Sequence, residues 1–279
     1  MGERLEDWIG REESHVDVLD ARPARLMQSI LPTEDVFAPG AALPPLWNWL
    51  YFHAPASLDA LGRDGHAKKG GFLPPVPLPR RMWAGGRFEF YDDLRIGDEI
   101  ERRSKILSVA PKEGRTGPLC FVTVEHTYLR AGRAVWREEH DIVYREDPNP
   151  GQPPPKAKAP PERFTDHEVV HPSIVMLFRY SALTFNGHRI HYDRQYAREV
   201  EGYPDLVFHG PLTATFLVEF ARRRSAGRLA QFGYRALAPL FDSAPFEMHL
   251  AREPGATSAW AVTPEGGLAM VAEARFEGD

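Results

Sequence analysis

The chain has 279 residues, of which 43% are hydrophobic and 26% charged, so it is long enough to bury one large or two moderate globular cores. The formal net charge of −5 provides no strongly basic field for phosphates, which excludes nucleic acid as an expected partner. The charged N-terminal residues and the lack of any apolar run of ~18 residues predict neither a secretory signal nor a membrane span, so we expect a cytoplasmic protein with no membrane partner.

The first half of the chain is predicted to form one helix followed by a strand meander. Residues 44–61 are expected to be helical. Four side chains are expected to be buried there: Trp47, Leu50, Tyr51 and Leu58. Alternating apolar residues then predict three long strands, at 100–110, 120–129 and 134–144. The turn at 130–133 joins the last two strands as an antiparallel hairpin.

The single cysteine, Cys120, lies in the second of these strands. A lone cysteine excludes an intrachain disulfide and favours a reducing compartment. Because its neighbours are apolar, we expect a buried thiol rather than a reactive nucleophile.

A proline-rich segment, 147–161, marks the clearest boundary in the chain. Seven of its fifteen residues are proline, which fixes φ and lacks a backbone N–H, so neither a helix nor a central strand is expected there. We interpret it as a semi-stiff surface linker between a first domain, 1–146, and a second domain, 162–279.

The second domain is predicted to repeat the order of the first, with helices before strands. Two helices are expected, at 173–183 and 208–225. Four strands are expected to follow, at 229–238, 246–251, 258–263 and 268–276. A long apolar helix followed by about four antiparallel strands favours an α+β unit in which a sheet wraps one helix. The two halves share no repeat at the level of residues; they are similar only in the order of their predicted helices and strands.

The densest group of polar side chains, residues 185–193, follows the helix at 173–183. Asn186 and Gly187 form a turn dipeptide, so the residues after them are expected to leave the helix. His188, His191 and Asp193 have a spacing that would also suit metal ligands, but no further Cys or His pair is placed to complete a shell. We therefore expect no metal.

A second feature is the entry to the long apolar helix, at His209 and Gly210, with proline next. Proline is compatible with a first helical turn, and glycine lets a substrate approach the backbone closely. The unpaired N–H groups of a helix N-terminus suit a developing oxyanion.

These stretches together resemble MaoC-like hydratases and dehydratases. The resemblance is carried by RYSALTFNGHRIHYD at 179–193, by GYP at 202–204 and HGPL at 209–212, and by GGFLPPVPLPRRMWAGG at 70–86 in the first half. It is closest to the subgroup of mesaconyl-C4-CoA hydratase, itaconyl-CoA hydratase and type 2 hydroxyacyl-thioester dehydratase. The resemblance implies a double hot-dog fold, with a non-catalytic first domain that shapes the substrate tunnel.

The resemblance also implies roles for particular residues. The MaoC-like pattern pairs an aspartate with a histidine five positions later; here His191 takes the histidine place and Asn186 stands where the aspartate usually is. We expect His191 to exchange the protons, Asn186 to help hold the water, and the Gly210 N–H to stabilise the oxyanion, with coenzyme A as the substrate's carrier and no other cofactor. Six residues are candidates for substrate binding: His188, Arg189, Arg179, His209, Arg80 and Arg81.

The reaction expected is reversible hydration of an enoyl thioester, with a C5-dicarboxylyl-CoA (mesaconyl-C4-CoA or itaconyl-CoA, giving citramalyl-CoA) as the first candidate substrate. Dehydration of a 3-hydroxyacyl thioester in fatty acid synthesis is the alternative. A hot-dog thioesterase and a non-catalytic acyl-CoA-binding subunit are alternative hypotheses from other functional classes. Exposed apolar sheet faces would favour a homo-oligomer.

Overall fold

Ten antiparallel strands form one continuous sheet in the computed structural model, which describes residues 4–114, 117–147, 157–253 and 255–278. The strand order is β1-β3-β4-β5-β2-β7-β10-β9-β8-β6. The strands are β1 Glu12–Val18, β2 Arg80–Phe90, β3 Glu99–Gly114, β4 Gly117–Arg130, β5 Arg133–Arg145, β6 Asp166–Val170, β7 Leu229–Ala236, β8 Phe246–Glu253, β9 Ala256–Val262 and β10 Leu268–Phe276.

The two halves of the sheet have the same internal order. Outward from the centre, the first half runs β2, β5, β4, β3, β1 and the second runs β7, β10, β9, β8, β6. The halves meet where β2 pairs with β7, with Gly86 opposite Tyr234. A Cβ at Gly86 would lie 2.7 Å from the Tyr234 hydroxyl, so glycine allows this close junction. The repeated order of elements expected from the sequence thus corresponds to a repeated strand topology in the sheet.

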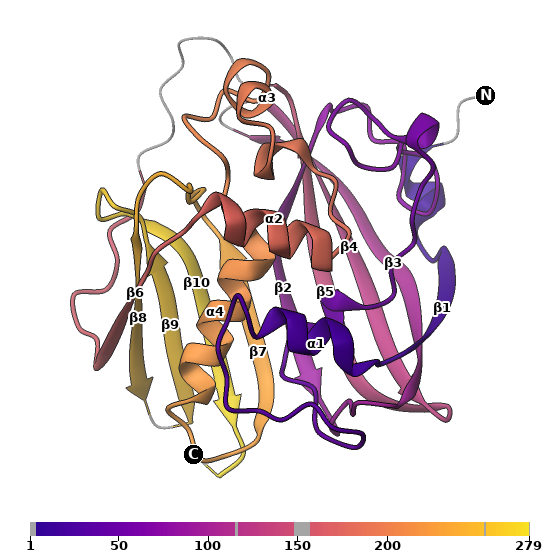
Figure 1. The fold of residues 1–279 in the computed structure, drawn as a ribbon. Helices are drawn as coiled ribbons and strands as arrows, with labels where there is room; N and C mark the ends of the chain where they lie inside the picture. Colours follow the sequence, from indigo (N-terminus) through magenta and orange to yellow (C-terminus); the bar gives the residue numbers. More distant parts are fainter. Residues whose placement is uncertain (1–3, 115–116, 148–156, 254, 279) are drawn as a thin grey trace.

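The second half contains the long helix that a hot-dog unit requires. Helix α4, Gly210–Arg222, begins with Pro211 in its first turn and packs against β7, β8, β9 and β10. Helix α2, Ile174–Leu183, is capped by Ser173, whose hydroxyl accepts from the Met176 N–H. Both agree with the predicted helices, as do the four predicted strands. Figure 1 shows α1 (Ala21–Met27), α2 and α4 on the same side of the sheet.

The helix predicted at 44–61 is wrong. The structure has two short 3-10 turns there, Trp47–Leu50 and Leu58–Ala60. Leu46 and Phe52 adopt left-handed backbone angles, with φ of 69° and 61°, which end the first turn on both sides. Trp47, Leu50 and Tyr51 are nevertheless buried, whereas Leu58 is 88% exposed.

The three strands predicted in the first half are confirmed as β3, β4 and β5, and each is longer than predicted. Cys120 is buried on β4, and burial raises the pKa of its thiol. Strands β1, β2 and β6 were not predicted. Most of the proline-rich segment, 148–156, lies outside the described residues; at its end the Lys158 carbonyl accepts from the Leu268 N–H. Within the described part of the chain, no helix has the length and apolar character needed to cross a bilayer.

Candidate active site

The loop after α2 positions the central polar residues. Phe185 takes a left-handed conformation (φ 48°), and the Asn186 N–H donates back to the Ser181 carbonyl, so the chain turns sharply where a turn was predicted. The Asn186 side-chain oxygen accepts the backbone N–H of His188 at 2.9 Å. Since that oxygen is already used, the side-chain NH₂ of Asn186 is the group available to a ligand.

His191 is buried at the end of a 3-10 turn, Arg189–His191. Its Nδ1 lies 2.7 Å from the Val207 carbonyl, which fixes the proton on Nδ1 and leaves Nε2 as a hydrogen-bond acceptor. Burial lowers the pKa of His191 to about 4. The ring is therefore neutral at neutral pH and able to accept a proton at Nε2.

His209 connects His191 to the start of α4. The two imidazoles stack with centroids 3.7 Å apart, and His209 is the residue immediately before Gly210 in the N-terminal cap of α4. His209 Nε2 also lies 2.9 Å from the Ser181 hydroxyl. The structure thus brings His191 and the Gly210 end of the helix together, although 19 positions separate the two residues in the sequence.

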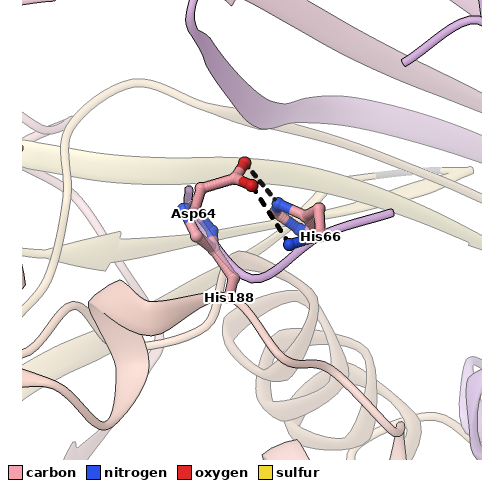
Figure 2. Close-up of side chains that lie close together, drawn as sticks. All are labelled: Asp64, His66 and His188. Atoms are coloured by element: carbon pink, nitrogen blue, oxygen red, sulfur yellow. Dashed lines mark hydrogen bonds and ion pairs between the residues drawn. The ribbon is translucent and has the colours of Figure 1, made fainter. Parts of the chain in front are cut away.

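The first half contributes an aspartate and a histidine to the same place. The His66 ring nitrogen Nδ1 lies 2.8 Å from Asp64 Oδ2, and its backbone N–H donates to the other carboxylate oxygen at 3.1 Å. The His66 ring faces that of His188, with centroids 4.3 Å apart (Figure 2). His188 in turn lies edge-on to His191 at 5.4 Å. Asp64 and His66 therefore lie beside the predicted catalytic loop, next to His188.

This approach depends on two glycines. A Cβ on Gly65 would lie 2.0 Å from the Gly187 carbonyl oxygen, and a Cβ on Gly187 would lie 2.8 Å from the Gly65 oxygen. The Arg189 N–H donates to the Asp64 carbonyl at 2.9 Å. The backbones of the two loops thus touch directly, and a side chain at Gly65 or Gly187 would separate them.

Asp64, His66 and His188 have ligand atoms that all lie within 4.8 Å of one another, the only such group suited to a metal in the described residues. Both carboxylate oxygens of Asp64, however, already accept hydrogen bonds from His66. These bonds lower the pKa of Asp64 against the opposing effect of burial, so Asp64 is ionised. As it stands, the group is a carboxylate–imidazole pair beside a second imidazole, the arrangement that orients and polarises a histidine.

A cavity of about 360 Å³ lies between the two halves. The second half contributes Tyr180, Asn186 and Pro211 to its wall, and the first half contributes Trp83 and Arg102. His191 and Gly210 are not among the lining residues, but Gly210 immediately precedes Pro211, and the His191 ring stacks on that of His209, the residue before Gly210. A thioester that reaches both would therefore enter between the two halves.

The predicted substrate-binding arginines do not gather at this cavity. Arg80 is buried and forms an ion pair with Glu201, and Arg189 forms one with Asp193. Arg179 is exposed and donates to the Ser29 hydroxyl. Burial lowers the pKa of His66 and His188, and the nearby charge of Arg81 adds to this effect. Arg189 contacts the same group through its backbone N–H, which donates to the Asp64 carbonyl. None of the four lines the cavity.

Three other points complete the site. Asp193 caps α3, Arg194–Glu199, where its side chain accepts the Tyr196 N–H. Asp64 and His66 were missed, although they precede the recognised stretch 70–86 by only a few positions. Arg102 was missed because it lies inside a strand with alternating polarity, where arginine usually faces solvent.

Comparison with known proteins identifies the family of the chain. The family model of hydroxyacyl-thioester dehydratase type 2 matches residues 46–242. Mesaconyl-C(4)-CoA hydratase of Chloroflexus aurantiacus is 43% identical over 273 residues, which cover 97% of each chain. A MaoC-like dehydratase from Phytophthora capsici superposes with a TM-score of 0.71 at 16% identity, covering 98% of this chain and 99% of that one.

A Mycobacterium tuberculosis protein with a double hot-dog fold superposes with a TM-score of 0.58 at 13% identity, with 96% of each chain covered. These structural likenesses confirm the α+β double hot-dog fold, and the sequence matches confirm the resemblance to hydro-lyases that act on acyl thioesters. The chain belongs to the type 2 hydroxyacyl-thioester dehydratase family of MaoC-like hydratases and dehydratases.

Proposed function

We propose that this protein adds water reversibly across the α,β double bond of an enoyl-CoA, with a C5-dicarboxylyl-CoA such as mesaconyl-C4-CoA as the preferred substrate. The observation that carries the proposal is the hydrogen bond from His191 Nδ1 to the Val207 carbonyl, because it leaves Nε2 as a base beside the N-terminus of α4. The substrate named for the Chloroflexus relative supports the acyl class. Itaconyl-CoA as a second substrate and a cytoplasmic location remain expectations.

In the proposed hydration, a water molecule is held between His191 Nε2 and the NH₂ of Asn186. His191 takes one proton from the water as its oxygen bonds to the β-carbon. The π electrons move toward the thioester, whose oxygen gains negative charge and accepts the N–H of Gly210. The imidazolium then returns the proton to the α-carbon, so that one water is added in total. Dehydration follows the same steps in reverse.

The Asp64–His66 pair supplies the negative charge that Asn186 cannot. A protonated His191 in a buried site needs a nearby anion, and the usual aspartate of the MaoC-like pattern is replaced here by an amide. Asp64 is ionised and contacts His66, whose ring adjoins that of His188, and His188 lies edge-on to His191. We therefore assign Asp64 and His66 as positioning residues and keep His188 as a rival base.

The cavity favours the dicarboxylyl substrate over the long acyl chains of fatty acid synthesis. Arg102, His126, Glu138 and His140 all contribute to its lining, and an alkyl chain would leave Arg102 Nε and His140 Nε2, which are buried without hydrogen-bond partners, still unpaired. No carboxylate is a free nucleophile in the lining among the described residues, since Glu138 is held by the Trp49 and Tyr128 side chains. This disfavours the thioesterase alternative.

The experiment that tests the proposal is an assay of the purified protein with mesaconyl-C4-CoA and with crotonyl-CoA. Loss of the conjugated thioester is followed together with release of free thiol. We expect hydration of mesaconyl-C4-CoA without thiol release. Thiol release would indicate a thioesterase, and binding without any hydration would indicate an acyl-binding subunit; either result overturns the proposal.

A further inference from the structure

The cavity between the two halves contains one cation, Arg102, for which the described residues provide no ion pair. Arg102 projects from β3 on the row that it shares with Tyr128 of β4, and it is the one arginine or lysine among the described lining residues. Its Nε is buried without a hydrogen-bond partner. No ion pair joins its guanidinium to any described residue, and its Cζ lies over the ring of Phe52, 5.3 Å from the centroid.

The other charged group in the lining does not meet this need. Glu138 is fully engaged: its carboxylate accepts from Trp49 Nε1 at 2.9 Å and from the Tyr128 hydroxyl at 2.8 Å. Burial also raises the pKa of Glu138, which favours its neutral form. Arg102 is close enough to oppose that rise but makes no direct contact with the acid. Glu138 is therefore not the partner of the Arg102 guanidinium.

The histidines of the lining do not add to the positive charge. Burial lowers the pKa of His53, His126 and His140, so the three rings are neutral at neutral pH. Arg102 is therefore the permanent charge that an anion inside this cavity would meet. A planar guanidinium also offers two parallel donors to a carboxylate, a geometry that lysine or histidine cannot provide.

We propose that Arg102 binds a second carboxylate of the acyl group and so selects dicarboxylyl thioesters. This inference rests on the proposed function, since Asn186 and Pro211, which adjoin the proposed reaction centre, line the same cavity. In mesaconyl-C4-CoA that carboxylate is attached to the β-carbon, so its contact with Arg102 also fixes the face that this carbon presents to His191. A methyl group or a hydrogen in its place leaves the guanidinium unpaired.

The test uses two pairs of thioesters that differ at the β-carbon. Succinyl-CoA and butyryl-CoA, which do not react, differ by a carboxylate in place of a methyl group, and their binding is measured by calorimetry. Mesaconyl-C4-CoA and crotonyl-CoA report turnover, and they differ by a carboxylate in place of a hydrogen. The variants are Arg102→Gln and Arg102→Lys. Arg103→Gln is the matched control, because Arg103 is the next residue on β3, is exposed, and is held by Glu101.

We expect the wild type and Arg103→Gln to bind succinyl-CoA more tightly than butyryl-CoA and to prefer mesaconyl-C4-CoA. Arg102→Gln should lose about a hundredfold in kcat/KM for mesaconyl-C4-CoA while crotonyl-CoA turnover changes little. Arg102→Lys should keep part of the preference. Unchanged crotonyl-CoA turnover shows that the variants are folded.

Two results overturn the inference while the proposed function stands: an unchanged preference in Arg102→Gln, or equal losses for both substrates, which would place Arg102 against the coenzyme A part or in a structural role. A wild type that hydrates neither substrate would instead overturn the proposed function. If Arg102→Gln does not fold, Arg102→Lys decides, since an unchanged succinyl-CoA preference in that variant also counts against the bidentate contact.

Discussion

The two halves of the sheet have the same strand order, but different elements cover their inner faces. In the second half, α4 lies across β7–β10 and ten of its residues are buried. In the first half, the short turn Trp47–Leu50 takes the place of the predicted helix, and the inner face of β3–β5 carries polar residues such as Arg102 and Glu138.

This difference explains how two similar units can divide one task. A full helix on the first half would cover its inner face, whereas the shorter turn leaves the cavity of about 360 Å³. The second half supplies the loop of His191 and the start of α4, and the first half supplies the Asp64–His66 pair and the cavity wall. The first domain was expected only to shape the substrate tunnel; in our proposal it also contributes residues that position the catalytic loop.

The largest effect is expected at the base in the second half. His191→Ala should lower kcat/KM for hydration by a hundredfold or more, because it removes the group that accepts the proton of water. Steady-state assays with mesaconyl-C4-CoA would measure this. His171→Ala, at an exposed histidine just before α2, is the control and should keep normal activity. A near-normal rate for His191→Ala would remove this residue from the mechanism and leave His188 as the base.

The contact between the halves is tested by a pair of glycine variants. Gly65 and Gly40 both have positive φ, +88° and +85°, but a Cβ at Gly40 meets nothing within 4 Å. Gly65→Ala should be about 2 kcal/mol more destabilising than Gly40→Ala in denaturant unfolding, because only the first adds a clash with the Gly187 carbonyl. Hydration should also fall only in Gly65→Ala. Equal stabilities would mean that the two loops do not touch as described.

The contribution of the first half to the chemistry is tested at Asp64. Asp64→Asn keeps the shape but removes the charge, and we expect about a tenfold loss in kcat, with little change in KM. Asn186→Asp, which restores the usual carboxylate, should recover part of that loss in the double variant. If Asp64→Asn is fully active, the first half provides no charge to the reaction.

The smallest effect is expected in the pH profile. Because burial lowers the pKa of His191 from 6.5 to about 4, the base remains neutral, and kcat/KM should stay level as the pH falls from 8 to about 5. The unfolded chain takes up the proton near 6.5, so stability falls as the pH drops between about 6.5 and 4, and unfolding must be measured at each pH. A decline centred near 6.5 in a fully folded enzyme would contradict the burial of this ring.

The sequence predicted those parts of the fold that depend on local pattern. The strands of the meanders, Pro211 in a first turn and the sharp turn near Asn186 all follow from residue type and spacing. The error at 44–61 arose because apolar spacing suggested a helix while the left-handed residues Leu46 and Phe52 imposed turns.

The parts of the site that depend on long-range contacts could not be predicted in the same way. Asp64 reaches His188 only because β2 and β7 join the two halves, and Arg102 faces inward only because of the register of β3 with β4. The paired arginines show the reverse case. Arg80 and Arg189 were candidates for substrate binding because of their positions near the motifs, but each already forms an ion pair, with Glu201 and Asp193 respectively.

The most direct test of the joint site is a crystal structure of the protein with bound butyryl-CoA, which cannot react. We predict the thioester oxygen at hydrogen-bond distance from the Gly210 N–H, the β-carbon within one water of His191 Nε2, and the acyl group in the cavity between the halves. A thioester bound elsewhere, with His191 Nε2 out of reach of its β-carbon, would contradict the account.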